Sequence, residues 1–227
     1  MIVCPSCQSE MRDDASCKFC GFVAESIDGF VAFAPQLAVA NNNYVAAFHE
    51  KLFQLENNCF WFSERNNLLI WAIKKYFPAI ESFLEIGCGT GYVLNGLAQT
   101  CHKINYTGAD IYTTGLKYAA ERVPQAKFIQ MDARCIPFRD EYDVIGAFDI
   151  IEHVEEDQEI LDQMFKAVRS GGGIMITVPQ HKWLWSATDD YGCHKRRYTR
   201  HELTEKVIKS GFEVIKIVSF ISLLLPL

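Results

Sequence analysis

The apolar residues of the chain first follow a helical spacing and later form the short runs that are typical of buried strands. Over residues 43–57 and 63–77 they recur every three to four positions, which predicts two helices. Pro78 ends the second helix, because proline lacks the backbone donor that a helix needs. The aromatic stretch CFWF at residues 59–62 lies between these helices, and we expect it to pack in the core.

From residue 82 onward, apolar runs alternate with amphipathic segments. Short strand–helix alternation indicates βαβ units, and therefore an α/β fold with a doubly wound, mostly parallel sheet. The expected strands are 83–87, 105–111, 127–133, 142–151, 172–178 and 212–220, and the expected helices are 91–99, 112–123, 155–170 and 199–211. Thr199 with Glu202 three residues later predicts a capping box at the start of the last helix.

The N-terminal segment carries two C-x-x-C pairs, Cys4 with Cys7 and Cys17 with Cys20. Four thiolates in this arrangement suit a structural zinc ion, whereas two disulfides or a rubredoxin-type iron are the alternatives. We expect residues 25–35 to supply the strand and turn that close a small zinc ribbon. The predicted domains are a zinc ribbon at 1–36, N-terminal helices that form a lid at 37–82, and the main domain at 83–227.

Composition narrows the function classes. The chain has 227 residues, 49% of them hydrophobic, and a formal net charge of −6, which argues against a nucleic-acid partner. The sequence shows neither a signal peptide nor an apolar run of about 20 residues that could span a membrane. Nine cysteines without an export signal indicate a reducing, cytoplasmic location.

The stretch LEIGCGTGY places Gly87, Gly89 and Gly91 at alternate positions, directly after an expected strand and before an expected helix. Glycines there permit a tight turn and let a ligand approach the backbone. A dinucleotide loop would need glycine or alanine where Tyr92 stands, and a phosphate loop would need G-K-S/T, so both of these sites are excluded.

The pattern E-x-G-x-G-x-G, from Glu85 to Gly91, resembles the first motif of class I S-adenosylmethionine-dependent methyltransferases, over about residues 60–227. The resemblance implies that Asp110 accepts hydrogen bonds from the ribose hydroxyls and that Asp132 accepts one from the adenine amino group. The alternative for Asp110 is a solvated strand end or helix cap, and the alternative for Asp132 is a helix N-cap. The cofactor-binding residues it implies are Glu85, Gly87, Cys88, Gly89, Gly91, Asp110, Ile111, Asp132, Ala133 and Phe148.

Asp149, Glu152 and His153 form a D-x-x-E-H cluster after the fourth strand of the main domain. His153 is the candidate general base, with Asp149 beside it, because histidine titrates near neutral pH. The cluster is similar to the E-x-x-E-H segment of ubiquinone-pathway O-methyltransferases, which implicates magnesium, although aspartate replaces the first glutamate here. The third interpretation is a histidine that only supports the loop.

Two segments supply candidate acceptor-binding residues, one before the glycine loop and one after the fifth strand of the main domain. Aromatic rings next to bases can hold a sugar, a phosphate-bearing acceptor or a nucleotide. Alternatively, the second segment is a lid, with tryptophans on the core and arginines paired with Asp189 and Asp190. The candidates are Trp61, Arg65, Trp183, Trp185, His194, Arg196, Arg197 and Tyr198.

The resemblance implies methyl transfer to a hydroxyl or an amino group of a small-molecule or saccharide-type acceptor. An RNA methyltransferase and a cofactor-binding module without catalysis are the alternatives. The apolar tail at 219–227 stands where this family has a seventh strand; it either replaces that strand or marks a shortened chain, and it favours self-association.

Overall fold

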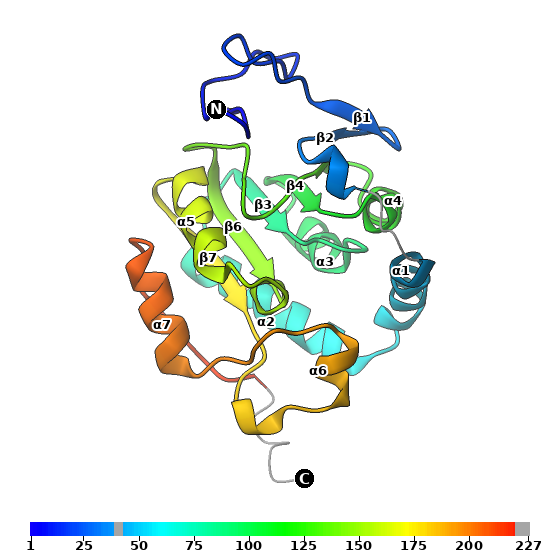
Figure 1. Cartoon of the computed structure of the whole chain (residues 1–227). Helices are drawn as coiled ribbons and strands as arrows, with labels where there is room; N and C mark the ends of the chain where they lie inside the picture. Colours follow the sequence, from blue (N-terminus) through cyan, green and yellow to red (C-terminus); the bar gives the residue numbers. More distant parts are fainter. Residues whose placement is uncertain (39–42, 221–227) are drawn as a thin grey trace.

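The computed structural model describes residues 1–38 and 43–220 (Figure 1). The strands are β1 (Glu25–Ile27), β2 (Phe30–Ala32), β3 (Ser82–Ile86), β4 (Asn105–Asp110), β5 (Lys127–Gln130), β6 (Tyr142–Phe148) and β7 (Val168–Thr177). The helices are α1 (Asn43–Glu56), α2 (Phe60–Tyr76), α3 (Tyr92–Thr100), α4 (Thr113–Arg122), α5 (Asp157–Ala167), α6 (Ala187–Tyr191) and α7 (Arg200–Lys209). Single 3-10 turns lie at Pro35–Leu37, Ile151–His153 and Lys182–Leu184.

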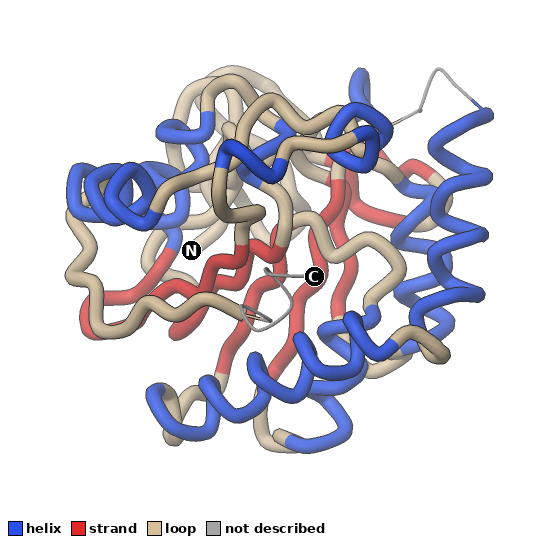
Figure 2. The backbone as a smooth tube through the Cα atoms, turned by 90° about the horizontal axis from the view of Figure 1, so that it is seen from below, coloured by secondary structure: helices blue, strands red, loops and turns tan. Residues whose placement is uncertain are grey.

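The strands form one sheet in the order β1-β2-β5-β4-β3-β6-β7, and every neighbouring pair except β1–β2 is parallel. Figure 2 shows helices on both sides of this sheet. The predicted doubly wound α/β fold is therefore confirmed. The carboxyl ends of the parallel strands share one edge, where open α/β sheets bind their ligands.

The β1–β2 hairpin differs from its prediction. Asp28 and Gly29 form its turn with φ of 54° and 88°, as the type I′ turn of a two-residue hairpin requires. β2 pairs with β5, and the buried Gln130 side chain bonds to both backbone groups of Ala34. The segment expected to close the ribbon therefore extends the main sheet instead.

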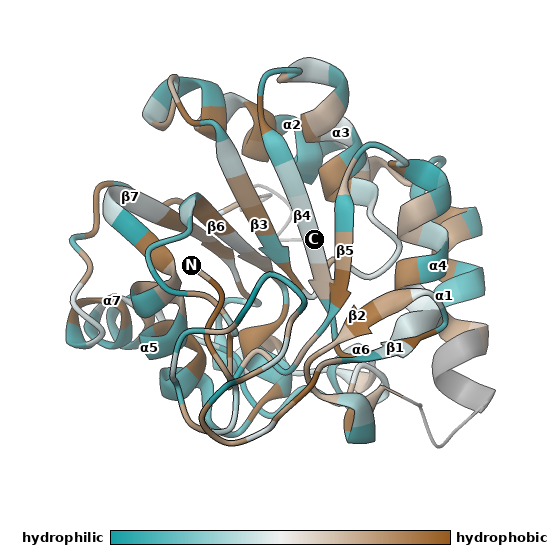
Figure 3. Cartoon of the chain, turned by 90° about the horizontal axis from the view of Figure 1, so that it is seen from above, coloured by the Kyte–Doolittle hydropathy of each residue, from teal (hydrophilic) through white to brown (hydrophobic). Residues whose placement is uncertain are grey.

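The two faces of the sheet bury two separate apolar clusters, because side chains alternate along each strand. Leu84 and Ile86 pack with α5 on one face, and Phe83 packs with α2, α3 and α4 on the other. Figure 3 shows brown, apolar stretches on β5 and β6, whereas β4 is pale to teal. Cys4 and Cys17 join the first cluster, where residues 131–141 connect β5 to β6 without a helix. The N-terminal segment thus covers sheet that a crossover helix would otherwise cover.

Three local predictions are wrong. Residues 212–220 form no strand; they have the alternation of a strand, but no neighbouring strand in the described chain pairs with them. The helix expected at 155–170 ends at Ala167, since β7 begins at Val168. Phe60 and Trp61 are 60% and 42% exposed rather than core residues, because they lie in the first turn of α2, whose buried contacts come from Leu69 and Ile73.

Two further predictions concern the C-terminal part of the chain. The capping box of Thr199 and Glu202 at the start of α7 is confirmed. Most of the apolar tail, residues 221–227, falls outside the described residues, so the replacement of a seventh strand and self-association stay predictions. The same holds for the exact domain boundaries.

Candidate active site

The glycine loop joins β3 to α3, and Gly87, Gly89 and Gly91 all have positive φ, at 67°, 50° and 75°. A Cβ atom on Gly87 would lie 2.0 Å from the Ile150 side chain, whereas a Cβ atom on Gly89 would meet nothing within 4 Å. Gly87 is therefore needed because a larger residue would clash with the Ile150 side chain. Gly89 exposes its backbone to open space at the carboxyl edge of the sheet, as a ligand-binding loop requires.

Asp110, at the end of β4, holds this loop in shape. One carboxylate oxygen accepts a hydrogen bond from the Gly89 N–H at 2.9 Å, and the other accepts one from the Tyr112 N–H at 2.9 Å. Burial raises the pKa of Asp110, partly offset by these donors and by nearby His49. Each carboxylate oxygen keeps a lone pair for a further donor, so the aspartate can hold both the loop and a ligand hydroxyl.

Glu85 lies beneath the loop and is almost fully buried, and one of its carboxyl oxygens has no hydrogen-bond partner in the part of the chain that the structure describes. Burial raises its pKa to about 8, although Arg65 acts in the opposite direction. Cys88, also assigned to the cofactor, is buried, and its thiol therefore has a strongly raised pKa. Only its backbone remains for ligand contact, because the thiol faces the core.

An ion pair that the sequence analysis missed fastens α1 to the glycine loop. The Arg122 guanidinium lies 2.6 Å from the Glu56 carboxylate, and both side chains are buried. The Thr90 hydroxyl donates to the same carboxylate at 2.6 Å. Two turns earlier on α1, His49 Nδ1 lies 2.9 Å from the Thr114 hydroxyl, close to Asp110. The sequence contains no signal for the Glu56 contact, since α1, the glycine loop and α4 each contribute one residue.

Asp132 follows β5, at the carboxyl edge predicted for it. Both of its oxygens contact the Arg134 guanidinium, at 2.8–3.1 Å, and one accepts the Arg134 backbone N–H. Residues 133–141 form no helix, so the alternative of a helix N-cap is wrong. A role for Asp132 and the neighbouring Ala133 in adenine binding stays a prediction, as does that of Ile111; Phe148 is buried at the end of β6.

Asp149 begins the acceptor side of the site, directly after β6. It has a φ of 57°, which is rare for aspartate and marks a constrained turn. Arg65 from α2 forms a salt bridge with one oxygen, and the Thr177 hydroxyl donates to the other at 2.9 Å. The Arg65 contact brings the first predicted acceptor segment to the D-x-x-E-H cluster. Nothing in the described chain supports magnesium at Asp149.

Glu152, His153 and His194 meet beside this pair, with ligand atoms that all lie within 4.8 Å of one another. Glu152 is 0% exposed, and neither carboxyl oxygen has a hydrogen-bond partner among the described residues. Burial, together with Asp149, raises its pKa to about 9. Burial and the neighbouring His194 lower the pKa of His153, whose ring centroid is 4.7 Å from that of His194. His153 is therefore neutral and able to accept a proton.

The segment after β7 folds around one buried carboxylate, Asp189. It accepts bonds from Arg197 at 2.7 and 2.9 Å and lies 3.0 Å from His194 Nδ1. The Arg197 guanidinium holds the pKa of Asp189 far below its usual range. This pairing of an arginine with Asp189 confirms part of the lid interpretation. Asp190 instead accepts from the Trp185 indole at 3.0 Å.

The other candidates of this segment divide into internal and exposed residues. Arg196 pairs with Glu155 and Asp157, and the buried Tyr198 hydroxyl donates to Asp157 at 2.8 Å. The contacts of these two side chains are with carboxylates of the protein, and they stabilise the segment after β7. Trp183 and Trp185 are 70% and 42% exposed, so the expectation of tryptophans packed on the core is wrong. Their rings remain available for contact.

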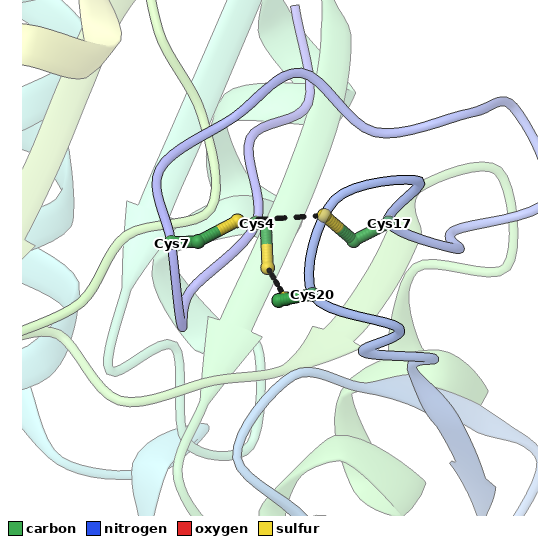
Figure 4. Close-up of side chains that lie close together, drawn as sticks. All are labelled: Cys4, Cys7, Cys17 and Cys20. Carbon is green, nitrogen blue, oxygen red and sulfur yellow. Dashed lines mark hydrogen bonds between the residues drawn. The ribbon is translucent and has the colours of Figure 1, made fainter.

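The four N-terminal cysteines meet in one cluster (Figure 4). Sulfur–sulfur distances are 3.5 Å for Cys4–Cys20 and 3.4 Å for Cys7–Cys17, well beyond the length of a disulfide. Two matching turns present them: the N–H groups of Gln8 and Gly21, both at positive φ, donate to the carbonyl oxygens of Cys4 and Cys17. All four thiols are free, in an arrangement compatible with a tetrahedral metal ion.

A family model for a methyltransferase domain matches residues 53–217, which span the glycine loop, Asp110 and the acceptor side. The chain belongs to this methyltransferase family. It is 25% identical over 158 residues to a probable S-adenosylmethionine-dependent methyltransferase of Mycolicibacterium smegmatis, covering 68% of this chain and 60% of that protein. A ubiquinone biosynthesis O-methyltransferase of Rickettsia bellii is 29% identical, covering 50% and 49%.

Solved structures agree with the fold of this methyltransferase. A possible histamine N-methyltransferase of Thermotoga maritima superposes with a TM-score of 0.58 at 20% identity, covering 74% of this chain and 77% of that one. This chain spans about half to three fifths of the length of the curated relatives named above. No helix among residues 1–38 and 43–220 is long and apolar enough to cross a membrane.

The residues around the glycine loop fit S-adenosylmethionine, the cofactor named for the Mycolicibacterium relative. No atom of the described residues lies within 4 Å of a Cβ placed on Gly89, and a Cβ on Gly115 would come within 2.9 Å of the Gly89 carbonyl oxygen. Asp110 lies at the adjacent strand end. The protein thus fixes the conformation of the loop through Asp110, while the Gly89 backbone remains accessible to a ligand.

Proposed function

We propose that this methyltransferase transfers a methyl group to a hydroxyl or amino group of a small organic acceptor. The acceptor would lie between the Arg65–Asp149 pair and the cluster of Glu152, His153 and His194. The convergence of these residues from α2, the end of β6 and the lid carries the proposal, since it sets titratable groups beside the cofactor edge of the sheet.

The glycine loop and Asp110 would hold the cofactor, with the Gly89 backbone against its amino-acid part and the lone pairs of Asp110 toward its ribose. The bound cofactor supplies a methyl group on a positively charged sulfur. Because its leaving group is already good, the protein contributes mainly by aligning the acceptor and excluding water, an effect of up to ~7–11 kcal/mol at ideal geometry.

His153 would accept the proton that a hydroxyl acceptor must lose. Burial keeps its ring neutral, and the bend of the chain at Asp149 places it beside the strand end where the methyl group is expected. An amino acceptor that arrives unprotonated needs no such base. A large loss on replacement of His153 would therefore favour a hydroxyl acceptor.

The surroundings favour an acceptor with an apolar body. Trp61, Trp183 and Trp185 are exposed aromatic residues on the two acceptor segments. Curated relatives include a phosphatidylethanolamine N-methyltransferase and a fatty-acid O-methyltransferase, each matched over 41% of this chain. A saccharide has no such support. An RNA acceptor is disfavoured because Arg196 and Arg197, its expected contacts, pair with internal carboxylates.

We also propose that the cysteine cluster binds one structural zinc ion, which would leave no open position for a substrate. A cytoplasmic location fits the free thiols and stays a prediction.

Transfer of a labelled methyl group into a cell extract, fractionated into small molecules, lipids, RNA and protein, tests the acceptor class. We expect the label in the small-molecule or lipid fraction. The His153→Ala variant should reduce incorporation by roughly 10²–10⁴ while its S-adenosylhomocysteine affinity stays the same. Label that accumulates in RNA would overturn the proposal, as would full activity in the His153→Ala variant for a hydroxyl acceptor.

A further inference from the structure

We propose that Glu152, His153 and His194 form a second metal site, which binds a divalent transition metal ion of the zinc type. It is distinct from the cysteine cluster, which lies at the opposite end of the molecule in Figure 1, where the N-terminal loops are far from α6. One oxygen and two imidazole nitrogens would be the ligands.

Glu152 supplies the first argument. Its side chain has no exposed surface, and neither of its oxygens has a hydrogen-bond partner among the described residues. A buried carboxyl group without a partner is costly, and such groups are usually paired or coordinate a metal. One of its oxygens lies within 4.8 Å of one ring nitrogen of His153, the neighbouring residue, and of one ring nitrogen of His194 in the segment after β7.

Asp189 supplies the second argument, because it orients His194. Its carboxylate lies 3.0 Å from His194 Nδ1, which leaves Nε2 free for a metal. Metal-binding histidines commonly donate their other N–H to a carboxylate in this way. Arg197 fixes Asp189 by two hydrogen bonds, and the Lys195 N–H donates to the Glu152 carbonyl oxygen at 2.7 Å, so the lid and the turn are held together.

The ligand set selects the kind of metal. Two imidazoles and one carboxylate suit zinc, cobalt, nickel or iron, whereas magnesium prefers oxygen ligands alone. Ligands about 2.0–2.2 Å from a tetrahedral ion lie roughly 3.4 Å apart. Small side-chain rotations would therefore bring the three ligand atoms to the separation that a tetrahedral ion requires. Asp149 is not part of this group of ligand atoms; its oxygens contact Arg65 and Thr177.

Three protein ligands leave a fourth position open. An acceptor hydroxyl bound there would ionise more readily and would be held in place. With the metal bound, His153 is a ligand and no longer a base, so the hydroxyl would release its proton to water. This consequence rests on the proposed methyl transfer, whereas binding of the metal itself does not.

Metal content of the full-length protein, prepared without a histidine tag, tests the site. After incubation with zinc chloride and desalting, we expect two zinc ions per chain in the unmodified protein and one in Glu152→Gln and in His194→Ala. With cobalt in place of zinc, the unmodified protein should show an additional weak absorption that is typical of nitrogen and oxygen ligands, without thiolate charge transfer. This absorption should be absent from both variants. Asp189→Asn should weaken binding of this second ion about 10–100-fold.

His201→Ala is the matched control, because the His201 side chain is 80% exposed and outside the cluster, and it should keep both ions. Glu152→Gln preserves side-chain shape, so it decides the outcome if His194→Ala lowers the melting temperature. A single zinc per unmodified chain would overturn the site, as would equal binding of the second ion by Glu152→Gln. None of these measurements uses an acceptor, so their failure leaves the proposed methyl transfer standing.

Discussion

The cysteine cluster and the cluster of Glu152, His153 and His194 are the two proposed metal sites, and they arise in opposite ways. The cysteines lie within 17 residues of chain, and matching local turns present each pair. Glu152 and His153 are adjacent, but His194 is 41 residues further on and is oriented by Asp189. The first depends on spacing, whereas the second depends on the lid folding onto the turn after β6.

This difference extends to stability. Cys4 and Cys17 belong to the core on one face of the sheet, so the proposed zinc ion would also support the fold. The histidine cluster lies at the carboxyl edge, where side chains must remain accessible to a substrate. A change in the first cluster should therefore affect folding, and a change in the second should affect function.

The largest effect is expected from replacing Cys17 and Cys20 together by serine. Without zinc the N-terminal segment loses its main source of folding energy and uncovers the core on that face. We expect loss of zinc at this site and a fall in unfolding free energy of roughly 5 kcal/mol, or about 10–20 °C in melting temperature. Elemental analysis and calorimetry measure both.

Cys193→Ser is the control, because Cys193 is exposed and outside the cluster. It should change neither zinc content nor melting temperature. Freshly purified protein that contains no metal and two disulfides instead would show that the four cysteines do not form a zinc site.

The next effect concerns an ion pair assembled by the fold. Glu56→Ala leaves the buried Arg122 without its partner beside the glycine loop, which should cost about 3–5 kcal/mol in denaturant unfolding. Lys117→Ala, which breaks an exposed pair with Asp28, should cost at most about 1 kcal/mol. Equal losses in both variants would mean that α1 is not fastened through this contact.

A matched pair of glycine variants separates binding from packing. Gly89→Ala places a methyl group in open space, so it should weaken S-adenosylhomocysteine binding by about 10–100-fold with only a modest loss from the strained φ. Gly87→Ala directs its methyl group into Ile150 and should mainly lower stability. Titration calorimetry and thermal melting distinguish them; normal cofactor affinity in Gly89→Ala would contradict the assignment of the loop.

The most gradual effect is a dependence on pH. The folded state holds the proton of Glu85 up to a pKa of about 8, whereas the unfolded state releases it near 4.5. The folded state thus binds more protons between these values, and its stability should fall as pH rises, by up to about 1.4 kcal/mol per unit. Glu85→Gln should flatten this slope in melts between about pH 5 and 8. An unchanged slope would show that Glu85 is not the group responsible.

Sequence reasoning located most of the fold because its signals are local. The alternation of apolar runs predicted the parallel sheet, and Thr199 with Glu202 predicted a helix start that the structure confirms. The same reasoning was wrong at residues 212–220, since a strand pattern does not supply a pairing partner. It also assigned the β1–β2 hairpin to the ribbon, because no pattern reveals that β2 will pair with β5.

The sequence by itself determined the order of the βαβ units, the conformational freedom of the glycine loop and the cysteine spacing. These features depend on residues a few positions apart, whose relative placement the backbone restricts. Only the tertiary structure decided that Arg197 serves Asp189, that Arg122 reaches Glu56, and that His194 meets Glu152. Those contacts join separate elements, and their geometry exists only once the apolar faces of the sheet and helices have packed.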